Sequence, residues 1–319
     1  MENPDVLCVG LVVADLVCAP IRRFPDAGGL ETTDRLELSI GGCASNVAVD
    51  LTKLNVAVEV IGRIGNDALG EYVRKAMTEQ GVGGKYLSVS TTSQTAATQV
   101  VNVAGEDRRF IHAVGANAEL TGLEVSDEVL KQAKIIYVGG FGLNAALSGK
   151  NVADLFRRAR EFGVLTVLDV VIGEPAIIRE MLPDALPETD FFLPNRDEAN
   201  VLTGLDEPIE QANEFRRLGA ANVVVTLGEG GSLLLDQEGR LLQMPPLQVV
   251  QVDGTGGGDA FAAGFMYGLL KKEPLERCLQ LGTTLGASCV QATGATTSVY
   301  RENELLAAIN DCPAPFTVK

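Results

Sequence analysis

The sequence predicts an α/β protein with a doubly wound, mostly parallel sheet, helices on both of its faces, and a small additional β-sheet. The run Val6–Val13 is apolar throughout, as expected of a strand that is covered on both faces of a parallel sheet. Further apolar runs alternate with helical patterns along the chain. Later strands of this series are expected near Ile135–Val138, Val164–Asp169, Phe191–Leu193 and Val223–Leu227. Two neighbouring β-rich runs within about residues 96–114 interrupt the alternation and predict the small sheet.

Composition favours one soluble domain with a small ligand. No repeat, linker or low-complexity tract divides the 319 residues, so we expect a single domain spanning 1–319. Hydrophobic residues make up 46% of the chain, enough for a sizeable core. The formal charge of −16 argues against nucleic acid or an anionic membrane as a partner. Because this charge also repels nucleotide phosphates, a phosphate site would need backbone amides, a few Arg side chains and a metal.

The cysteines and the single histidine exclude several kinds of chemistry. Six cysteines stand without paired spacing, mostly in apolar runs, which indicates reduced thiols and a cytoplasmic protein. His112 is the only histidine, so histidine clusters cannot hold a metal, and a hydrolase triad would have one candidate base. The apolar run Val6–Ile21 lacks a basic start and contains Asp15, so we interpret it as a buried strand rather than a signal peptide.

The stretch 249–270 carries the clearest chemical signal. It is typical of a short strand, Val249–Val252, followed by a glycine-rich turn and a helix. The first amides of a helix lack internal partners, so Gly256, Gly257 and Gly258 could turn their N–H groups toward an anion. Asp259 stands at the same helix start and could be an ordinary cap. A cap does not need three residues without side chains, whereas close approach of a phosphate does, which favours a phosphate site.

The segment from Asp253 to Asp259, DGTGGGD, resembles the second signature of the ribokinase-like carbohydrate kinases, or PfkB family, usually written DTxGAGD. Glycine replaces the usual Thr and the middle Ala, so the glycine backbone is kept. The resemblance implies a ribokinase-like fold and phosphoryl transfer from ATP. It also implies that Asp259 is the catalytic base at the substrate hydroxyl, and that Gly256, Gly257 and Gly258 form an anion hole for the γ-phosphoryl group.

Two N-terminal segments resemble the sugar-binding part of this family. Asp15 follows the first predicted strand, and the carboxyl ends of strands are where open α/β sheets bind ligands. In the family an Asp here holds sugar hydroxyls, in a pattern like GxxNxD; Val13 replaces the Asn, which counts against ribose. The run GGCASN resembles the first signature, GGxxxN. The resemblance implies that Gly41 and Gly42 let the chain pass close to the sugar and that Asn46 binds its hydroxyls, although a glycine pair alone more often marks a simple turn.

Two later turns resemble nucleotide-binding elements. Asn195 and Glu198 match NxxE, a pair that orders water around Mg²⁺ and the nucleotide phosphates in the family. The same spacing predicts a capping box, and both roles can hold together. Thr226, Gly228 and Gly231 match TLGxxG, a turn at a strand end beside the nucleotide.

Two further matches concern a cation and a helix start. Asp253, Thr255 and Ser298 correspond to residues that enclose a monovalent cation, such as K⁺, in many family members. Asp67 stands in a segment that resembles the family pattern vGxDxxG, but we interpret it as a helix cap.

The β-rich interruption also has a counterpart in the family. Thr98–Val103 and Arg108–Val114 are joined by a hairpin signal at Ala104–Asp107. Together with a region of about 15–40, this hairpin resembles the family's small β-sheet lid, inserted in the large domain. A short two-stranded ribbon is marginal alone. Folding over the sugar, or pairing with a second subunit to give a homodimer, would each explain it.

Two other classes of protein compete with a kinase. The run Gly140–Ala145 is a formal GxGxxA, and Asp169 ends the next strand, as in an NAD(P)-binding oxidoreductase. The helical pattern there begins only near Leu147, and nothing downstream indicates hydride chemistry. A non-catalytic sugar or nucleotide sensor on the same fold would be expected to lose Asp259 or the glycines before it, and both are present.

Six matches in family order, spread from Gly10 to Ser298, favour an ATP-dependent kinase. We therefore predict transfer of the γ-phosphoryl group to a hydroxyl of a sugar or sugar-like substrate, with a nucleoside kinase as the alternative. The partners expected are the small-molecule acceptor, ATP and Mg²⁺, with K⁺ as a further option. The sequence does not choose among the acceptors of the family.

Overall fold

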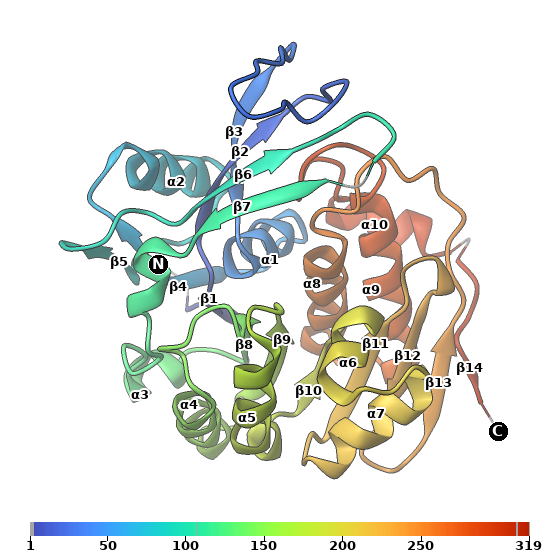
Figure 1. Ribbon diagram of the computed structural model, residues 1–319. Helices are drawn as coiled ribbons and strands as arrows, with labels where there is room; N and C mark the ends of the chain where they lie inside the picture. Colours follow the sequence, from blue (N-terminus) through green and yellow to red (C-terminus); the bar gives the residue numbers. More distant parts are fainter. Residues whose placement is uncertain (1–2, 107, 311, 319) are drawn as a thin grey trace.

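The computed structural model describes residues 3–106, 108–310 and 312–318. The strands of these residues form two sheets, one of ten strands and one of four. Figure 1 shows the four-stranded sheet standing apart from the larger one. The predicted combination of a large α/β sheet and a small separate sheet is therefore confirmed.

The large sheet is mostly parallel. Its strands are β1 (Val6–Gly10), β4 (Val58–Gly65), β5 (Leu87–Ser90), β8 (Ile135–Phe141), β9 (Leu165–Val170), β10 (Phe191–Phe192), β11 (Asn222–Thr226), β12 (Ser232–Leu235), β13 (Leu241–Met244) and β14 (Phe316–Thr317). The strand order is β14-β13-β12-β11-β10-β9-β8-β1-β4-β5. Neighbours from β5 to β11 pair in parallel, whereas β11 to β14 pair antiparallel. The antiparallel extension was not predicted.

Helices cover both faces of this sheet. One face carries α1 (Cys43–Lys53), α2 (Ala68–Glu79), α8 (Gly257–Leu270), α9 (Leu275–Cys289) and α10 (Glu302–Ala308), and the other carries α3 (Asp127–Leu130), α4 (Gly149–Glu161), α5 (Pro175–Ala185), α6 (Arg196–Thr203) and α7 (Pro208–Arg217). Single 3₁₀ turns lie at Gly115–Glu119, Leu186–Glu188 and Gly228–Gly230. No described helix is both long and apolar enough to cross a membrane.

The first strand shows why its sequence is apolar without alternation. Val6 and Cys8 pack into the core under α1 and α8, while Leu7 and Val9 pack into the core under α4 and α5. All four side chains are fully buried. A strand between two helical layers has no polar face, which is the arrangement expected in a parallel sheet.

The small sheet consists of β2 (Val13–Cys18), β3 (Leu36–Gly41), β6 (Ala97–Val101) and β7 (Arg109–Ala113), in the order β3-β2-β6-β7. The predicted hairpin is confirmed, because β6 and β7 pair antiparallel. Asp107, in its predicted turn, lies outside the described residues. The pairing of β2 with β6 is parallel and joins the two inserted regions into one sheet.

Two predicted placements are wrong. Asp15 does not end a strand of the large sheet: β1 ends at Gly10, and Asp15 lies within β2 of the small sheet. The segment Val249–Val252 is not a strand, and Val250 and Val252 are 80% and 60% exposed. This segment pairs with no strand among the residues that the structure describes, and it crosses the surface as a loop that leads into α8.

Candidate active site

The glycine-rich turn ends where α8 begins. Gly256 caps the helix with φ of 80°, and a Cβ atom added there would lie 2.2 Å from the carbonyl oxygen of Ala295. Only glycine fits this backbone without strain. Gly257 donates its N–H to Gly254, but the N–H groups of Gly256 and Gly258 have no acceptor among the described residues. At the positive end of a helix, such free amides suit an anion.

Gly256→Ala is therefore expected to distort the start of α8. The overlap with Ala295 and the positive φ together should cost roughly 2–4 kcal/mol of the free energy of unfolding. We expect the Tm to fall by about 4 °C or more. Gly258→Ala is the matched control, because an added Cβ atom there meets nothing within 4 Å. Equal Tm values for the two variants would contradict a requirement for glycine at position 256.

Asp259 lies in the first turn of α8, half-buried, and its Oδ2 accepts a hydrogen bond from Asn46 Nδ2 at 2.8 Å. Burial raises the pKa of Asp259 to about 6, and the nearby charge of Asp15 adds to this rise. Hydrogen bonds from Asn46 and Cys43 act in the opposite direction. The carboxylate is therefore ionised at neutral pH but is a stronger base than an exposed aspartate.

The glycine pair before α1 brings three predicted substrate-binding residues together. A Cβ atom on Gly41 would lie 1.9 Å from Asp15 Oδ2, so the carboxylate rests directly on the glycine backbone. Gly42 has φ of 93°, and its Cβ atom would lie 2.5 Å from a backbone oxygen of Leu11. Asn46 follows on α1, buried, with its Oδ1 atom unpaired among the described residues. Of these predicted substrate-binding residues, Asn46 contacts the carboxylate of Asp259 directly, and the charge of Asp15 acts on it.

Asp15 projects from the small sheet toward this site. Burial raises the pKa of Asp15 to about 6, and a hydrogen bond from the Thr98 hydroxyl partly offsets the rise. Thr98 lies opposite Asp15 on the paired strand β6. The small sheet therefore contributes this carboxylate, although Asp15 was expected at the end of the first strand, where the predicted lid region of about 15–40 begins.

The predicted nucleotide-binding residues are also adjacent. Asn195 caps α6 through a complete capping box: its Oδ1 accepts from the Glu198 N–H, and Glu198 Oε2 accepts from the Asn195 N–H. Thr226, at the end of β11, forms a bridge with Asn195. Gly228 and Gly231 follow with φ of 56° and 88° in the next turn. The predicted capping box is confirmed, and the two turns lie side by side.

Asp169 is a site residue that the sequence analysis missed. It lies near the end of β9 and accepts a hydrogen bond from Tyr137 Oη at 3.0 Å. One ligand atom each from Cys43, Asp169 and Asp259 lie within 4.8 Å of one another. The signal was a carboxylate at the carboxyl end of a parallel strand, but it had been assigned to the dinucleotide-binding alternative.

The carboxylates of Asp169, Asp259 and Glu198 form an acidic cluster. Burial raises the pKa of Asp169 well above its usual range, and the charges of Glu198 and Asp259 raise it further. Burial likewise raises the pKa of Glu198 to about 7, with the charge of Asp259 contributing. A bound cation would relieve this repulsion, and carboxylate oxygens are the ligands Mg²⁺ prefers. The carboxylates of this cluster are therefore suitable ligands for Mg²⁺.

The residues expected to hold a monovalent cation fit less well. Asp253 Oδ1 accepts hydrogen bonds from the N–H and hydroxyl of Thr255 and from Arg108, and Oδ2 accepts from the N–H of Gly294. Ser298 donates instead toward backbone oxygens of the C-terminal part of α9. The charge of Asp253 is already offset by a guanidinium, so a bare cation has little left to neutralise.

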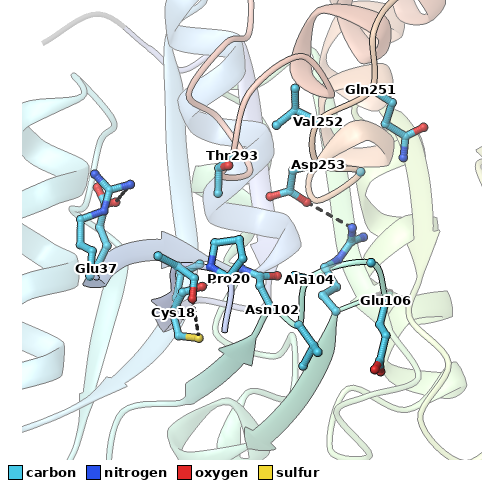
Figure 2. A pocket seen from close by; sticks show the side chains of 17 residues that line it. Cys18, Pro20, Glu37, Asn102, Ala104, Glu106, Gln251, Val252, Asp253 and Thr293 are labelled. Atoms are coloured by element: carbon cyan, nitrogen blue, oxygen red, sulfur yellow. Dashed lines mark hydrogen bonds and ion pairs between the residues drawn. The ribbon is translucent and has the colours of Figure 1, made fainter. Parts of the chain in front are cut away.

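A cavity of about 360 Å³ lies between the small sheet and the loop before α8. Residues of β2, β3 and the β6–β7 turn line one side, and Gln251–Gly254 with Thr293 line the other. Figure 2 shows Asp253 and Thr293 on one side of this cavity and Pro20 and Asn102 on the other. The small sheet and the loop before α8 thus line the same cavity.

The dinucleotide-binding alternative does not match the local structure. Strand β8 continues to Phe141, and α4 begins only at Gly149. The turn at Gly140–Ala145 is therefore not followed directly by a helix. The helix N-terminus that would bind a pyrophosphate in a dinucleotide-binding fold does not occur at this turn.

The fold, the helix that begins at the glycine-rich turn and the half-buried carboxylate of Asp259 in its first turn define a phosphotransferase of the carbohydrate kinase type. Residues 3–302 match the family described as pfkB family carbohydrate kinase, so the chain belongs to that family. An ATP-dependent 6-phosphofructokinase of Thermoanaerobacterium thermosaccharolyticum is 26% identical over 299 residues, covering 91% of this chain and 89% of the relative. A ribokinase of Arabidopsis thaliana is 29% identical over 314 residues, covering 95% and 80%.

A solved structure of Arabidopsis thaliana ribokinase, complexed with ribose and ATP, aligns with a TM-score of 0.85 and 26% identity. The alignment covers 97% of this chain and 99% of that chain. This likeness confirms the predicted ribokinase-like fold.

Proposed function

We propose that the protein transfers the γ-phosphoryl group of ATP to a hydroxyl of a sugar or sugar-like substrate. The observation that carries this proposal is the position of Asp259. Its half-buried carboxylate lies beside unpaired amides at the start of α8 and is bonded to Asn46. A base, an anion-binding helix start and hydroxyl-binding side chains are thus gathered at one place, as an alcohol phosphotransferase requires.

Asp259 accepts the proton of the attacking hydroxyl in this proposal. In a loose phosphoryl-transfer transition state the proton leaves late, so orientation of the hydroxyl matters more than basicity. Asn46 holds the carboxylate through the 2.8 Å hydrogen bond to Oδ2. The raised pKa of Asp259, about 6, strengthens the base without protonating it at neutral pH.

The free amides of Gly256 and Gly258 stabilise the negative charge that develops on the transferred group. Asp169 and Glu198 are the residues that would hold Mg²⁺, largely through water, because Mg²⁺ gives up its water reluctantly. When bound, the ion neutralises charge on the nucleotide phosphates. The turn of Thr226, Gly228 and Gly231 lies beside Asn195, where the nucleotide would extend.

Asp15 and Asn46 bind the hydroxyls of the acceptor in this proposal, and the small sheet acts as a lid over them. Asp15 belongs to β2 of that sheet, and its carboxylate lies against Gly41, the last residue of β3, two residues before α1 begins. The relatives named above are a 6-phosphofructokinase and ribokinases, so phosphorylated and free sugars are the first acceptors to test.

An acceptor panel tests the proposal most directly. Free sugars, sugar phosphates, sugar acids and nucleosides would each be incubated with the protein, ATP and Mg²⁺, and release of ADP would be measured against ATP alone. At least one acceptor should stimulate release well above the background. If only nucleosides are phosphorylated, the protein is a nucleoside kinase of the same family; no stimulation by any acceptor would contradict the proposed function.

The pH dependence should report the carboxylates of the site. The active form of Asp259 is deprotonated, so kcat/KM for the acceptor should rise between pH 5 and about pH 7.5 and then level off. Its pKa of about 6 and that of Glu198, about 7, set this window. These groups interact, so the apparent pKa belongs to the cluster. A profile that is flat above pH 5, as an ordinary carboxylate with a pKa of about 4 would give, would contradict the assignment.

A further inference from the structure

One ion pair links the small sheet to the loop before α8. Arg108, in the β6–β7 turn, places its Nη1 atom 3.1 Å from Asp253 Oδ1. The two side chains are only 26% and 16% exposed. Both residues line the cavity, and Figure 2 shows the ion pair as a dashed line from Asp253. The residues are 145 positions apart in sequence, so the contact exists only when the small sheet lies over the large domain.

Asp253 organises the loop that ends in the free amides. Its Oδ1 accepts from the N–H and the hydroxyl of Thr255 at 2.9 and 2.7 Å, and its Oδ2 accepts from the Gly294 N–H at 3.0 Å. Thr255 directly precedes Gly256, where the helix begins. One carboxylate therefore ties the start of α8 to the neighbouring loop.

This carboxylate is charged in the folded protein. Burial alone would raise the pKa of Asp253, but hydrogen bonds from Gly294 and Thr255 and the charge of Arg108 hold it below its usual range. A charge in a partly buried position is costly unless it has a counter-charge. Arg108 supplies that charge from the small sheet, where a monovalent cation was expected from the sequence.

We propose that Arg108 is a positioning residue for phosphoryl transfer: by pairing with Asp253, it completes the anion-binding loop when the small sheet closes. The idea rests on the proposed kinase function. With the sheet displaced, Asp253 would lose its counter-charge and the loop of Asp253–Gly258 would be less ordered. Transfer would then be supported only when the lid covers an acceptor, which limits wasteful hydrolysis of ATP.

The chain offers a matched control in the next residue. Arg109 also lies on the β6–β7 hairpin, but it pairs with Glu106 and lies over the ring of Phe24. Arg108→Gln and Arg109→Gln remove the same charge from the same hairpin. Only the first removes the bond to Asp253.

Steady-state kinetics with the best acceptor of the panel test the proposal. Arg108→Gln should lower kcat roughly 10- to 100-fold, the range for loss of a hydrogen bond to a charged group, with little change in the KM for ATP. Arg109→Gln should keep the kcat of the wild type. Combining Arg108→Gln with Asp253→Asn should lower kcat no further than Asp253→Asn alone, because Arg108 acts through Asp253. A wild-type kcat in Arg108→Gln, or fully additive losses, would overturn the proposal.

Two further readouts separate positioning from a general structural role. Added methylguanidinium should restore part of kcat in Arg108→Gly but not in Asp253→Asn. Amide hydrogen exchange over residues 253–258 should be faster in Arg108→Gln than in Arg109→Gln or the wild type. The exchange experiment needs no acceptor, so it decides the role of Arg108 even if the acceptor panel fails. Equal exchange in all three proteins would overturn the proposal.

Discussion

Asp259→Asn is expected to lower kcat at least about 100-fold while nucleotide binding survives. Asparagine keeps the size of the side chain and can still accept the hydrogen bond from Asn46, but it cannot take a proton. The change should therefore remove the base without disturbing the start of α8. Turnover with the best acceptor and binding of a fluorescent ADP analogue would be measured on the same preparation.

Asp197→Asn is the matched control for this substitution. Asp197 is an exposed acid in the first turn of α6, next to Glu198, so the variant loses one negative charge near the site without touching Asp259. Its kcat should stay within a factor of about two of the wild type. Near-normal turnover in Asp259→Asn would exclude Asp259 as the base.

Replacing residues 98–114 by a short Gly/Ser linker should abolish acceptor phosphorylation yet leave the large domain folded. The two main core clusters contain none of the removed residues. The ends to be joined are already adjacent, because Gly115 lies against the backbone of Gln94 and Ala96. Without the lid, water competes with the acceptor hydroxyl, so the ratio of ATP hydrolysis to transfer should rise. Thermal unfolding, nucleotide binding and both reaction rates would be measured; a folded deletion with unchanged acceptor kinetics would contradict the lid assignment.

The same deletion tests the proposal that the small sheet also forms a homodimer. Leu36 and Ile111 are apolar side chains of this sheet that are 58% and 63% exposed, as expected of a surface that a second copy could cover. Light scattering should show a dimer that becomes a monomer when the hairpin is removed. If the intact protein is already a monomer, only the closure role is retained.

Local sequence was sufficient to predict helix starts, where a positive φ or a capping interaction requires particular residue types. Three consecutive glycines before an acid predicted the start of α8, and Gly256 is in fact held at positive φ against Ala295. Asn and Glu three residues apart predicted the capping box of α6, because both partners lie within one helical turn. The alternation of apolar runs and helical patterns predicted the layered sheet for a similar reason. The pattern of apolar residues within each segment indicates whether it is a buried strand or a helix with one buried face.

The position of a residue in a particular sheet depends on strands that are distant in sequence, and local sequence did not predict it. Asp15 was expected at the end of the first strand, but that strand ends at Gly10 and Asp15 pairs with Ser39 and Thr98 inside the small sheet. The apolar segment Val249–Val252 has the composition of a strand but pairs with no strand in the described part of the chain. A strand requires a partner as well as suitable residues, and only topology supplies the partner.

The sequence by itself thus determined the fold class, the helix starts and the residue types of the site. The tertiary structure decided which of these residues meet. Asn46 and Asp259 are 213 positions apart, and Arg108 and Asp253 are 145 apart. The acidic cluster of Asp169 with its neighbours likewise exists only because β9, α6 and α8 end or begin at one edge of the sheet. The free energy of such contacts depends on how whole elements pack, and no local pattern of residues encodes that arrangement.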